Sequence, residues 1–101
     1  MKKILLLCSA GMSTSMIVKK MQDKAKADNI DAEIEAASIS RFEELADSYD
    51  IFLLGPQVKY MKNELTKKAN AKGKPLDVID FKDYGKMDGA KILDFALNLK
   101  L

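Results

Sequence analysis

The only cysteine of the chain, Cys8, ends an apolar run and is followed by small and hydroxyl-bearing residues. These residues, 9–15, read Ser-Ala-Gly-Met-Ser-Thr-Ser, and a helical pattern begins among them. In a loop of this kind backbone N–H groups point inward, and the N-terminus of the helix adds positive potential. The stretch is therefore typical of a phosphate-binding loop, in which Cys8 would be held as a thiolate and could carry a phosphoryl group.

The same pattern has a second interpretation, in which Cys8 is a buried structural thiol and the loop is an ordinary polar connection. Local spacing alone does not decide between the two. The composition narrows the chemistry, because the chain has one cysteine and no histidine. An internal disulfide, a Cys–His or Ser–His nucleophile pair and the usual zinc ligand sets are therefore excluded, and we expect no metal. If Cys8 is a nucleophile, backbone dipoles must activate it.

The overall composition is that of one ordinary globular domain. With 101 residues, 48% of them hydrophobic and 32% charged, we expect a single domain over residues 1–101. The 17 basic and 15 acidic residues give a net charge of +2, which is too mild to indicate a nucleic-acid partner. No apolar run approaches the roughly 20 residues that cross a bilayer. We expect a cytoplasmic monomer that does not insert into membranes.

Strand and helix patterns alternate along the chain. Apolar segments predict four strands, of which the first and third are continuous apolar runs and the second alternates like an edge strand: 3–8, 31–39, 50–54 and 76–79. Helical patterns follow at 13–28, 40–47, 58–71 and 88–99, and residues 80–87 read as a polar loop. This alternation predicts an α/β fold with a four-stranded parallel sheet, strand order 2-1-3-4, and helices on both faces.

Several residues predict where the helices begin and end. Ser13 or Thr14 can cap the first helix, and Ser40 with Glu43 has the spacing of a capping box. Gly73 stands where a left-handed helix end is expected. Asp88 is a candidate N-cap for the last helix.

The predicted topology brings three loops together at the carboxyl ends of the strands, where ligands of such sheets bind. The loops are residues 8–15, 55–60 and 80–88. Four residues of the second and third loops are candidates to line this crevice: Gln57, Tyr60, Tyr84 and Asp88. Each has an ordinary alternative, since Gln57 or Asp88 could cap a helix and the tyrosines could be packed aromatics. Asp88 could otherwise act as an acid near Cys8.

Three motifs on these loops carry a family resemblance: CSAGMSTS at 8–15, LLGPQVKYM at 53–61, and VID at 78–80 followed by YGKMDG at 84–89. They resemble the IIB component of the lactose/cellobiose (chitobiose) type of sugar phosphotransferase system. The resemblance implies that a phosphohistidine on the IIA protein phosphorylates Cys8. The phosphoryl group then passes to a β-linked disaccharide bound by the membrane permease IIC, with phosphocysteine as the intermediate and no cofactor. It also implies that the phosphate is held by Ser9, Ala10, Gly11, Met12, Ser13, Thr14 and Ser15.

The fold of this family in turn resembles that of low-molecular-weight tyrosine phosphatases, which makes a phosphatase the rival interpretation. Their signature is a cysteine, five further residues, an arginine and then a serine or threonine. Here Thr14 stands at the arginine position and Ser15 follows it. An arginine would bind phosphate with two hydrogen bonds and stabilise the transition state of ester cleavage. Its absence favours a phosphocysteine that is handed on over one that is hydrolysed.

Overall fold

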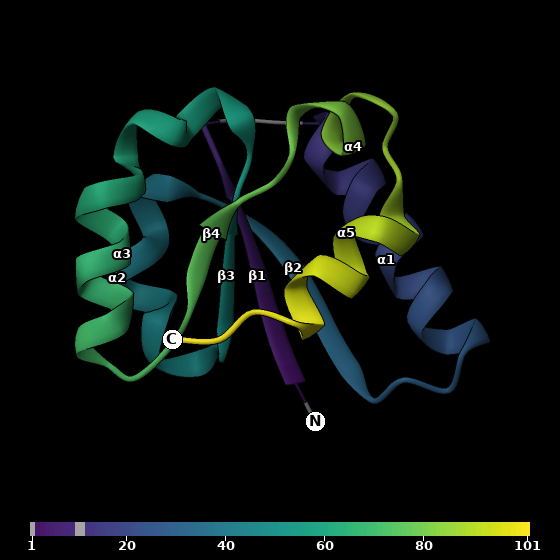
Figure 1. Cartoon of the computed structure of the whole chain (residues 1–101), viewed down its shortest axis with the longest axis horizontal. Helices are drawn as coiled ribbons and strands as arrows, with labels where there is room; N and C mark the ends of the chain where they lie inside the picture. Colours follow the sequence, from purple (N-terminus) through teal and green to yellow (C-terminus); the bar gives the residue numbers. More distant parts are fainter. Residues whose placement is uncertain (1, 10–11) are drawn as a thin grey trace.

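The computed structural model of the chain describes residues 2–9 and 12–101 and contains one parallel sheet (Figure 1). Its strands are β1 (Lys2–Cys8), β2 (Ala32–Ser38), β3 (Ile51–Leu54) and β4 (Leu76–Val78). They are ordered β2-β1-β3-β4, as the sequence predicted, and every neighbouring pair is parallel. The carboxyl ends of all four strands therefore lie at one edge, and the central strand β1 ends there at Cys8.

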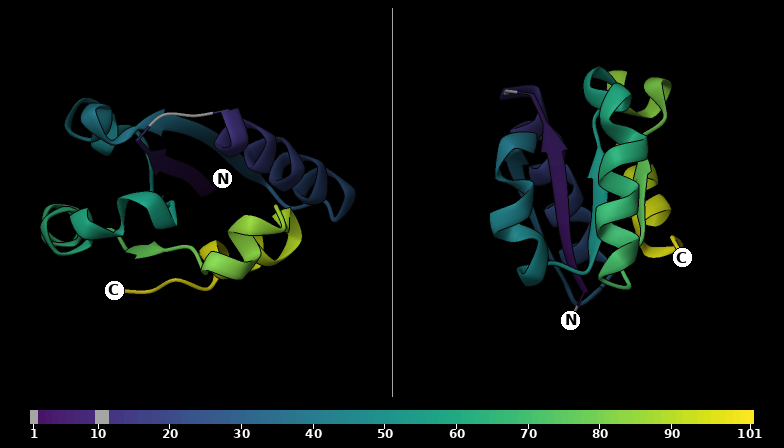
Figure 2. Two further views of the ribbon diagram at one scale, coloured as in Figure 1. Left: turned by 90° about the horizontal axis from the view of Figure 1, so that it is seen from above. Right: turned by 90° about the vertical axis from the view of Figure 1, so that its left-hand side faces the viewer.

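Helices cover both faces of the sheet, so the molecule has three layers (Figure 2). Helices α1 (Met12–Ala27) and α5 (Gly89–Leu97) cover one face, and α2 (Phe42–Leu45) and α3 (Lys62–Ala71) cover the other. Because both faces are covered, the whole of β3 and residues 4–8 of β1 are buried. None of the described helices is both long and apolar enough to span a membrane.

Successive residues of β1 enter two separate cores, because strand side chains alternate between the faces of a sheet. Ile4 and Leu6 pack in the core under α1 and α5. Leu5 and Leu7 pack in the core under α2 and α3, where the rings of Phe42 and Phe52 meet edge to face at 5.1 Å. Strand β2 is an edge strand, with Ile34 buried and its glutamates exposed, as its alternating pattern predicted.

Residues 80–87 are not the polar loop that the sequence predicted. They contain a short helix, α4 (Phe81–Gly85), which begins because the Asp80 carboxylate accepts hydrogen bonds from the backbone N–H groups of Lys82 (2.8 Å) and Asp83 (3.4 Å). The prediction of a loop was wrong because the segment is charged and short, whereas its cap is strong.

Two helix starts also differ from their predictions. Helix α1 begins at Met12, so Ser13 and Thr14 lie inside its first turn and not at the N-cap position that the sequence predicted. The segment predicted as one helix over 58–71 is divided into η3 (Pro56–Met61), which is a 3₁₀ segment, and α3. Val58 has non-helical φ and ψ angles (−114° and 21°), which separates the tight turn started by Pro56 from the helix.

The capping box predicted at Ser40 and Glu43 is wrong as well. Ser38 is the residue that caps, since its hydroxyl accepts from the N–H of Ser40 at 3.3 Å and opens the 3₁₀ segment η1 (Ile39–Arg41). Helix α2 has no side-chain cap and is followed by a further 3₁₀ segment, η2 (Ala46–Ser48). The Glu43 carboxylate reaches across to Lys68 of α3 at 2.6 Å and so is not available for the cap.

The other two helix signals are confirmed. Gly73 has φ +74°, the left-handed conformation expected at the end of α3. Asp88 caps α5, with a carboxylate oxygen 3.1 Å from the backbone nitrogen of Lys91. The apolar side chains of α5 and of the residues after it pack in the core shared with α1 and the sheet: Ile92, Leu93, Ala96, Leu97 and Leu99.

Candidate functional site

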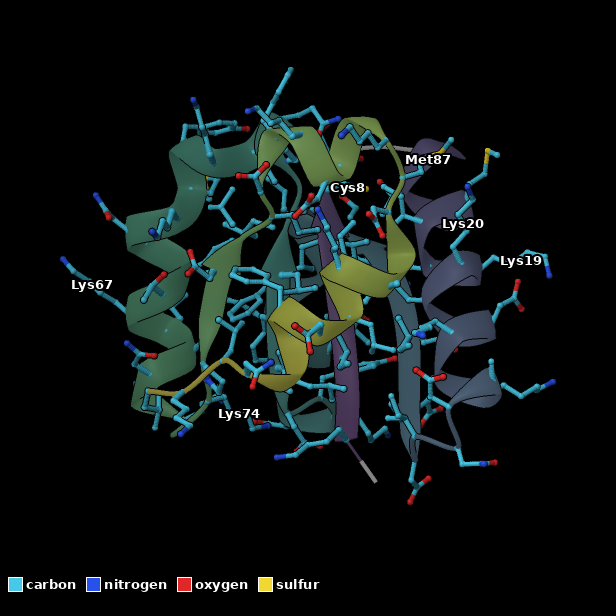
Figure 3. The ribbon with its side chains drawn as sticks, turned by 45° about the vertical axis from the view of Figure 1, so that its right-hand side comes forward. Cys8, Lys19, Lys20, Lys67, Lys74 and Met87 are labelled. Atoms are coloured by element: carbon cyan, nitrogen blue, oxygen red, sulfur yellow. The ribbon has the colours of Figure 1, made fainter. Side chains whose placement is uncertain are left out.

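The site is built around Cys8, the last residue of β1. Its side chain is buried, with 5% of the residue exposed, and its sulfur is a free thiol. In Figure 3 Cys8 lies at the same end of the molecule as α4 and the first turn of α1. Cys8 pairs with Ser38 of β2, and the neighbouring Leu7 pairs with Leu54 of β3, so strands on both sides fix the backbone that carries the thiol.

Helix α1 begins at Met12, shortly after Cys8 in the chain. It has 16 residues, no acidic residue in its first turn, and Lys24 and Lys26 in its last turn. The first N–H groups of a helix have no partner within it, and the helix dipole adds a partial positive charge at that end. The absence of a carboxylate in the first turn leaves this positive potential uncompensated, which favours a bound anion.

The residues predicted to hold phosphate are only partly within the described chain. Ser9 and Ser15 are exposed, whereas Thr14 is buried. Ala10 and Gly11 lie outside the described residues, and so do the side chains of Met12 and Ser13. Because Thr14 is almost completely buried, its hydroxyl lies in the interior of the protein.

Tyr84 of α4 is the partner of that hydroxyl. Its phenolic oxygen lies 2.9 Å from Oγ1 of Thr14, within hydrogen-bond distance, although the two residues are 70 positions apart in the sequence. Both are buried, with 8% of Tyr84 and 1% of Thr14 exposed. Tyr84 is thus a packed aromatic and also a hydrogen-bonding residue, a combination that the sequence did not reveal because the contact is long-range.

Gly55 follows β3 at a place where a side chain would press on Gln57. Its N–H donates to the carbonyl oxygen of Leu7 at 2.9 Å, which extends the β1–β3 pairing beyond the last residue of β3. A Cβ atom here would lie 2.8 Å from Oε1 of Gln57 and 3.4 Å from the ring of Tyr84. Glycine therefore permits both side chains to lie over the end of the central strands.

The remaining candidates occupy different positions. Gln57 is exposed and caps neither η3 nor α3, since neither has a side-chain cap. Tyr60 is 73% exposed on η3. Asp88 is engaged as the N-cap of α5, which confirms the capping interpretation of this residue. In the described part of the chain, no three His, Cys, Asp or Glu side chains are grouped so that they could hold a metal ion.

A hollow of about 470 Å³ lies beside the site, between the ends of β3 and β4. Phe81 stands at its edge with 79% of the residue exposed, a feature that the sequence analysis missed. The available signal was a large apolar residue within a charged segment. Eight residues line the hollow, and apart from Gln57 and Lys59 they are mostly apolar: Pro56, Gln57, Lys59, Val78, Ile79, Phe81, Tyr84 and Gly85.

The fold and the site together define a parallel α/β protein with one thiol at the point where the strand order reverses, next to the start of a helix. The chain belongs to the family of PTS system, lactose/cellobiose-specific IIB subunits, whose model matches residues 3–95.

Individual relatives agree with this assignment over nearly the whole chain. The PTS system cellobiose-specific EIIB component of Lactococcus lactis subsp. lactis is 50% identical, and the galactose-specific EIIB component of L. lactis subsp. cremoris is 47% identical. Each alignment covers 97% of this chain and 95% of the relative. The solution structure of the cellobiose-specific phosphotransferase IIB component from Borrelia burgdorferi superposes with a TM-score of 0.80 at 44% identity, covering 96% of this chain and 89% of that one.

Proposed function

We propose that this chain is a phosphoryl carrier of a sugar phosphotransferase system, in which Cys8 accepts a phosphoryl group from a phosphohistidine of a IIA protein. It then passes the group to a β-disaccharide of the cellobiose, lactose or chitobiose type, bound by a membrane permease IIC. The observation that carries this proposal is the position of Cys8 at the carboxyl end of β1, next to the start of α1, in a chain of the IIB family. The carrier is expected to act in the cytoplasm as a monomer.

The chemistry consists of two successive nucleophilic displacements at phosphorus. In the first, the sulfur of Cys8 attacks, the P–N bond to the histidine breaks as the P–S bond forms, and the thiol proton ends on the released imidazole. In the second, a sugar hydroxyl attacks, the P–S bond breaks as the P–O bond forms, and the hydroxyl proton is returned to the thiol. Phosphocysteine is the only covalent intermediate, and no cofactor takes part.

The backbone is the proposed source of phosphate binding. We expect the phosphate to be bound by backbone N–H groups of residues 9–15, among them those in the first turn of α1, where N–H groups have no partner within the helix. The Thr14 hydroxyl is already bonded to Tyr84, so we expect Thr14 to contribute chiefly through its N–H group. Without an arginine at this position, ester cleavage lacks a cation to stabilise its transition state, and transfer to a second partner is favoured over hydrolysis.

The proposal names the class of sugar and not one particular sugar. The cellobiose-specific and galactose-specific relatives are 50% and 47% identical to this chain, so overall similarity does not separate them. We expect the permease, which binds the sugar, to determine specificity.

The proposal is tested by incubating the purified chain with a phosphorylated IIA protein and locating any added phosphoryl group by mass spectrometry. One phosphoryl group on the Cys8 peptide is expected. A Cys8→Ser variant should fold normally and gain none. No gain, or a gain at another residue, would contradict the proposal. Turnover of p-nitrophenyl phosphate by the chain alone would instead indicate the phosphatase chemistry that the missing arginine argues against.

A further inference from the structure

The Tyr84–Thr14 pair joins two elements that border the site. Thr14 lies in the first turn of α1, and Tyr84 is on α4, which follows β4. Their hydroxyl oxygens are 2.9 Å apart in a buried environment. A buried hydroxyl that loses its partner retains the full penalty of its removal from water. The pair therefore ties the start of α1 to α4.

Tyr84 is itself fixed to the central strands. The N–H of Ile79 donates to the carbonyl oxygen of Leu54 at 2.9 Å, which continues the β3–β4 pairing up to the residue before the Asp80 cap. The N–H of Tyr84 donates to the carbonyl oxygen of Asp80 at 2.9 Å. One edge of the Tyr84 ring lies against Gly55, 3.4 Å from the place where a Cβ atom would stand.

These contacts connect the residues at the two ends of the proposed phosphate-binding stretch. The stretch leaves β1 at Cys8 and reaches Thr14 in the first turn of α1. From Leu7, the residue before Cys8, the path of contacts runs through Gly55 and the ring of Tyr84 back to Thr14. The Tyr84 side chain thus links the two ends of the stretch, in addition to the packing of α1 on the sheet.

We propose that the Tyr84–Thr14 hydrogen bond sets the position of the first turn of α1 relative to Cys8, and that Tyr84 is thereby a positioning residue for phosphoryl transfer. The inference rests on the proposed function. Tyr84 acts through Thr14 and the backbone N–H groups that follow Cys8, without touching the phosphoryl group. Displacement of such donors by a fraction of an ångström weakens their interaction with a transition state more than it weakens partner binding.

The test compares Tyr84→Phe, Thr14→Val and the double variant with the unchanged chain, in phosphoryl transfer from a phosphorylated IIA protein to Cys8. Each single variant leaves one buried hydroxyl unpaired, whereas the double variant leaves neither, so the double variant should regain much of the lost stability. If the bond positions α1, the double variant should nevertheless keep a kcat lowered by about tenfold, with KM for the IIA protein little changed. All rates are measured well below the lowest unfolding midpoint, so that stability does not limit them.

Two further variants separate positioning from general damage. Thr14→Ser keeps the hydroxyl and should transfer close to the unchanged rate, whereas Thr14→Val should not. Tyr49→Phe removes the phenolic hydroxyl from a ring that lies under the Lys3 ammonium, 5.4 Å from it, near the amino end of the sheet, and should leave transfer unchanged. If Tyr84→Phe does not fold, the contrast between serine and valine at position 14 decides the question.

The outcomes distinguish this inference from the proposed function. If the unchanged chain accepts no phosphoryl group, the proposed function fails. If it accepts one, and the double variant and Thr14→Val transfer at its rate, the function stands and the positioning role of Tyr84 is overturned. A raised KM with unchanged kcat would also overturn it, because that result would make Tyr84 part of a docking surface.

Discussion

Both helical faces pack on the sheet through an apolar core, but the contacts added to the two cores differ. On one face, α5 approaches α1 so closely that a Cβ atom at Gly89 would lie 2.7 Å from the carbonyl carbon of Lys20 and 2.8 Å from the nitrogen of Met21. No ion pair joins these two helices within residues 12–27 and 89–97 of the described chain. On the other face, two exposed ion pairs link α3 and its C-cap residue Lys72 to α2 and η2: Lys68–Glu43 at 2.6 Å and Lys72–Asp47 at 2.9 Å.

This difference in contacts matches the different parts of the protein that the two faces hold in place. The face formed by α1 and α5 contains the helix that begins next to Cys8. Its contacts are an apolar core, the close backbone approach at Gly89 and an uncharged hydroxyl pair, which salt and pH change little. The face formed by α2 and α3 supports the sheet, and part of its attachment is exposed ion pairs, which are screened by salt and contribute little to stability. The comparison predicts that substitutions on the α1/α5 face lower the rate of phosphoryl transfer. Substitutions on the α2/α3 face should lower only the stability of the fold.

The largest effect is expected from removing an aromatic ring on the α2 face. Phe42→Ala deletes a buried ring that packs edge to face on Phe52 and should lower the free energy of unfolding by about 3–5 kcal/mol. The remaining folded protein should still transfer phosphoryl groups at the unchanged rate, because both rings lie in the core under α2 and α3, on the face of the sheet away from α1. Urea denaturation gives the stability, and transfer is measured in low denaturant at a temperature where the variant is folded. A reduced rate per folded molecule would contradict the separation of the two faces.

The next effect should come from the contact between α1 and α5. Gly89→Ala places a methyl group against backbone atoms of α1, which must move, and this should cost about 1–3 kcal/mol. Because α1 moves, transfer to Cys8 should slow as well, unlike in Phe42→Ala. Gly85→Ala is the matched stability control, since a Cβ atom there meets nothing within 4 Å and the residue lies in a helix. Equal losses for the two alanine variants would remove the steric argument.

A smaller and more local effect is expected at Gly55. The Cβ atom of Gly55→Ala would meet the end of the flexible Gln57 side chain at 2.8 Å, which can turn away, and the Tyr84 ring at 3.4 Å, which must yield slightly. Stability should therefore fall by less than about 1 kcal/mol. Transfer should fall by a larger factor than this loss explains, because the ring is part of the path to Thr14. A variant with unchanged transfer would indicate that Tyr84 tolerates displacement.

The sequence was sufficient for most of the fold because its strongest signals are local. Continuous apolar runs at 4–7 and 51–54 identify strands buried on both faces, and the alternation of Ile34 with glutamates identifies the edge. From these the strand order, and with it the position of Cys8 at the carboxyl edge, followed correctly. Predictions of where a helix begins were wrong where the polar residue expected to cap it has a different partner, as Glu43 has in Lys68.

The contacts that complete the site were beyond the sequence because they join distant residues. Thr14 reads as a helix cap or phosphate ligand until its hydroxyl is found 2.9 Å from Tyr84, 70 residues away. Gly89 reads as an ordinary helix residue until α1 is packed against it. Asp80 is different, since its capping of α4 is local and could have been predicted.

The smallest effect is expected from the ion pairs on the α2 face. Hydrogen bonds from Lys68 and Lys72 hold the pKa values of Glu43 and Asp47 below their ordinary values of 4.5 and 3.8. The pairing with Glu43 raises the pKa of Lys68 above its ordinary value. The stabilisation from the two carboxylates is therefore present above their ordinary pKa values and is lost as the pH falls through the lowered ones.

Replacing both lysines in Lys68→Met/Lys72→Met should accordingly flatten the decline of stability below about pH 4.5 and reduce its dependence on salt, with transfer at neutral pH unchanged. The corresponding stabilisation from Lys68 is lost only in strong alkali, as the pH rises through its raised pKa. Lys67→Met is the control, because Lys67 points away from α3 into solvent (Figure 3) and makes no ion pair with the described residues. Urea midpoints measured from pH 3 to 7 would decide the matter. An acid response identical in all three proteins would show that the exposed pairs do not hold this face, and the contrast between the two faces would then rest on packing alone.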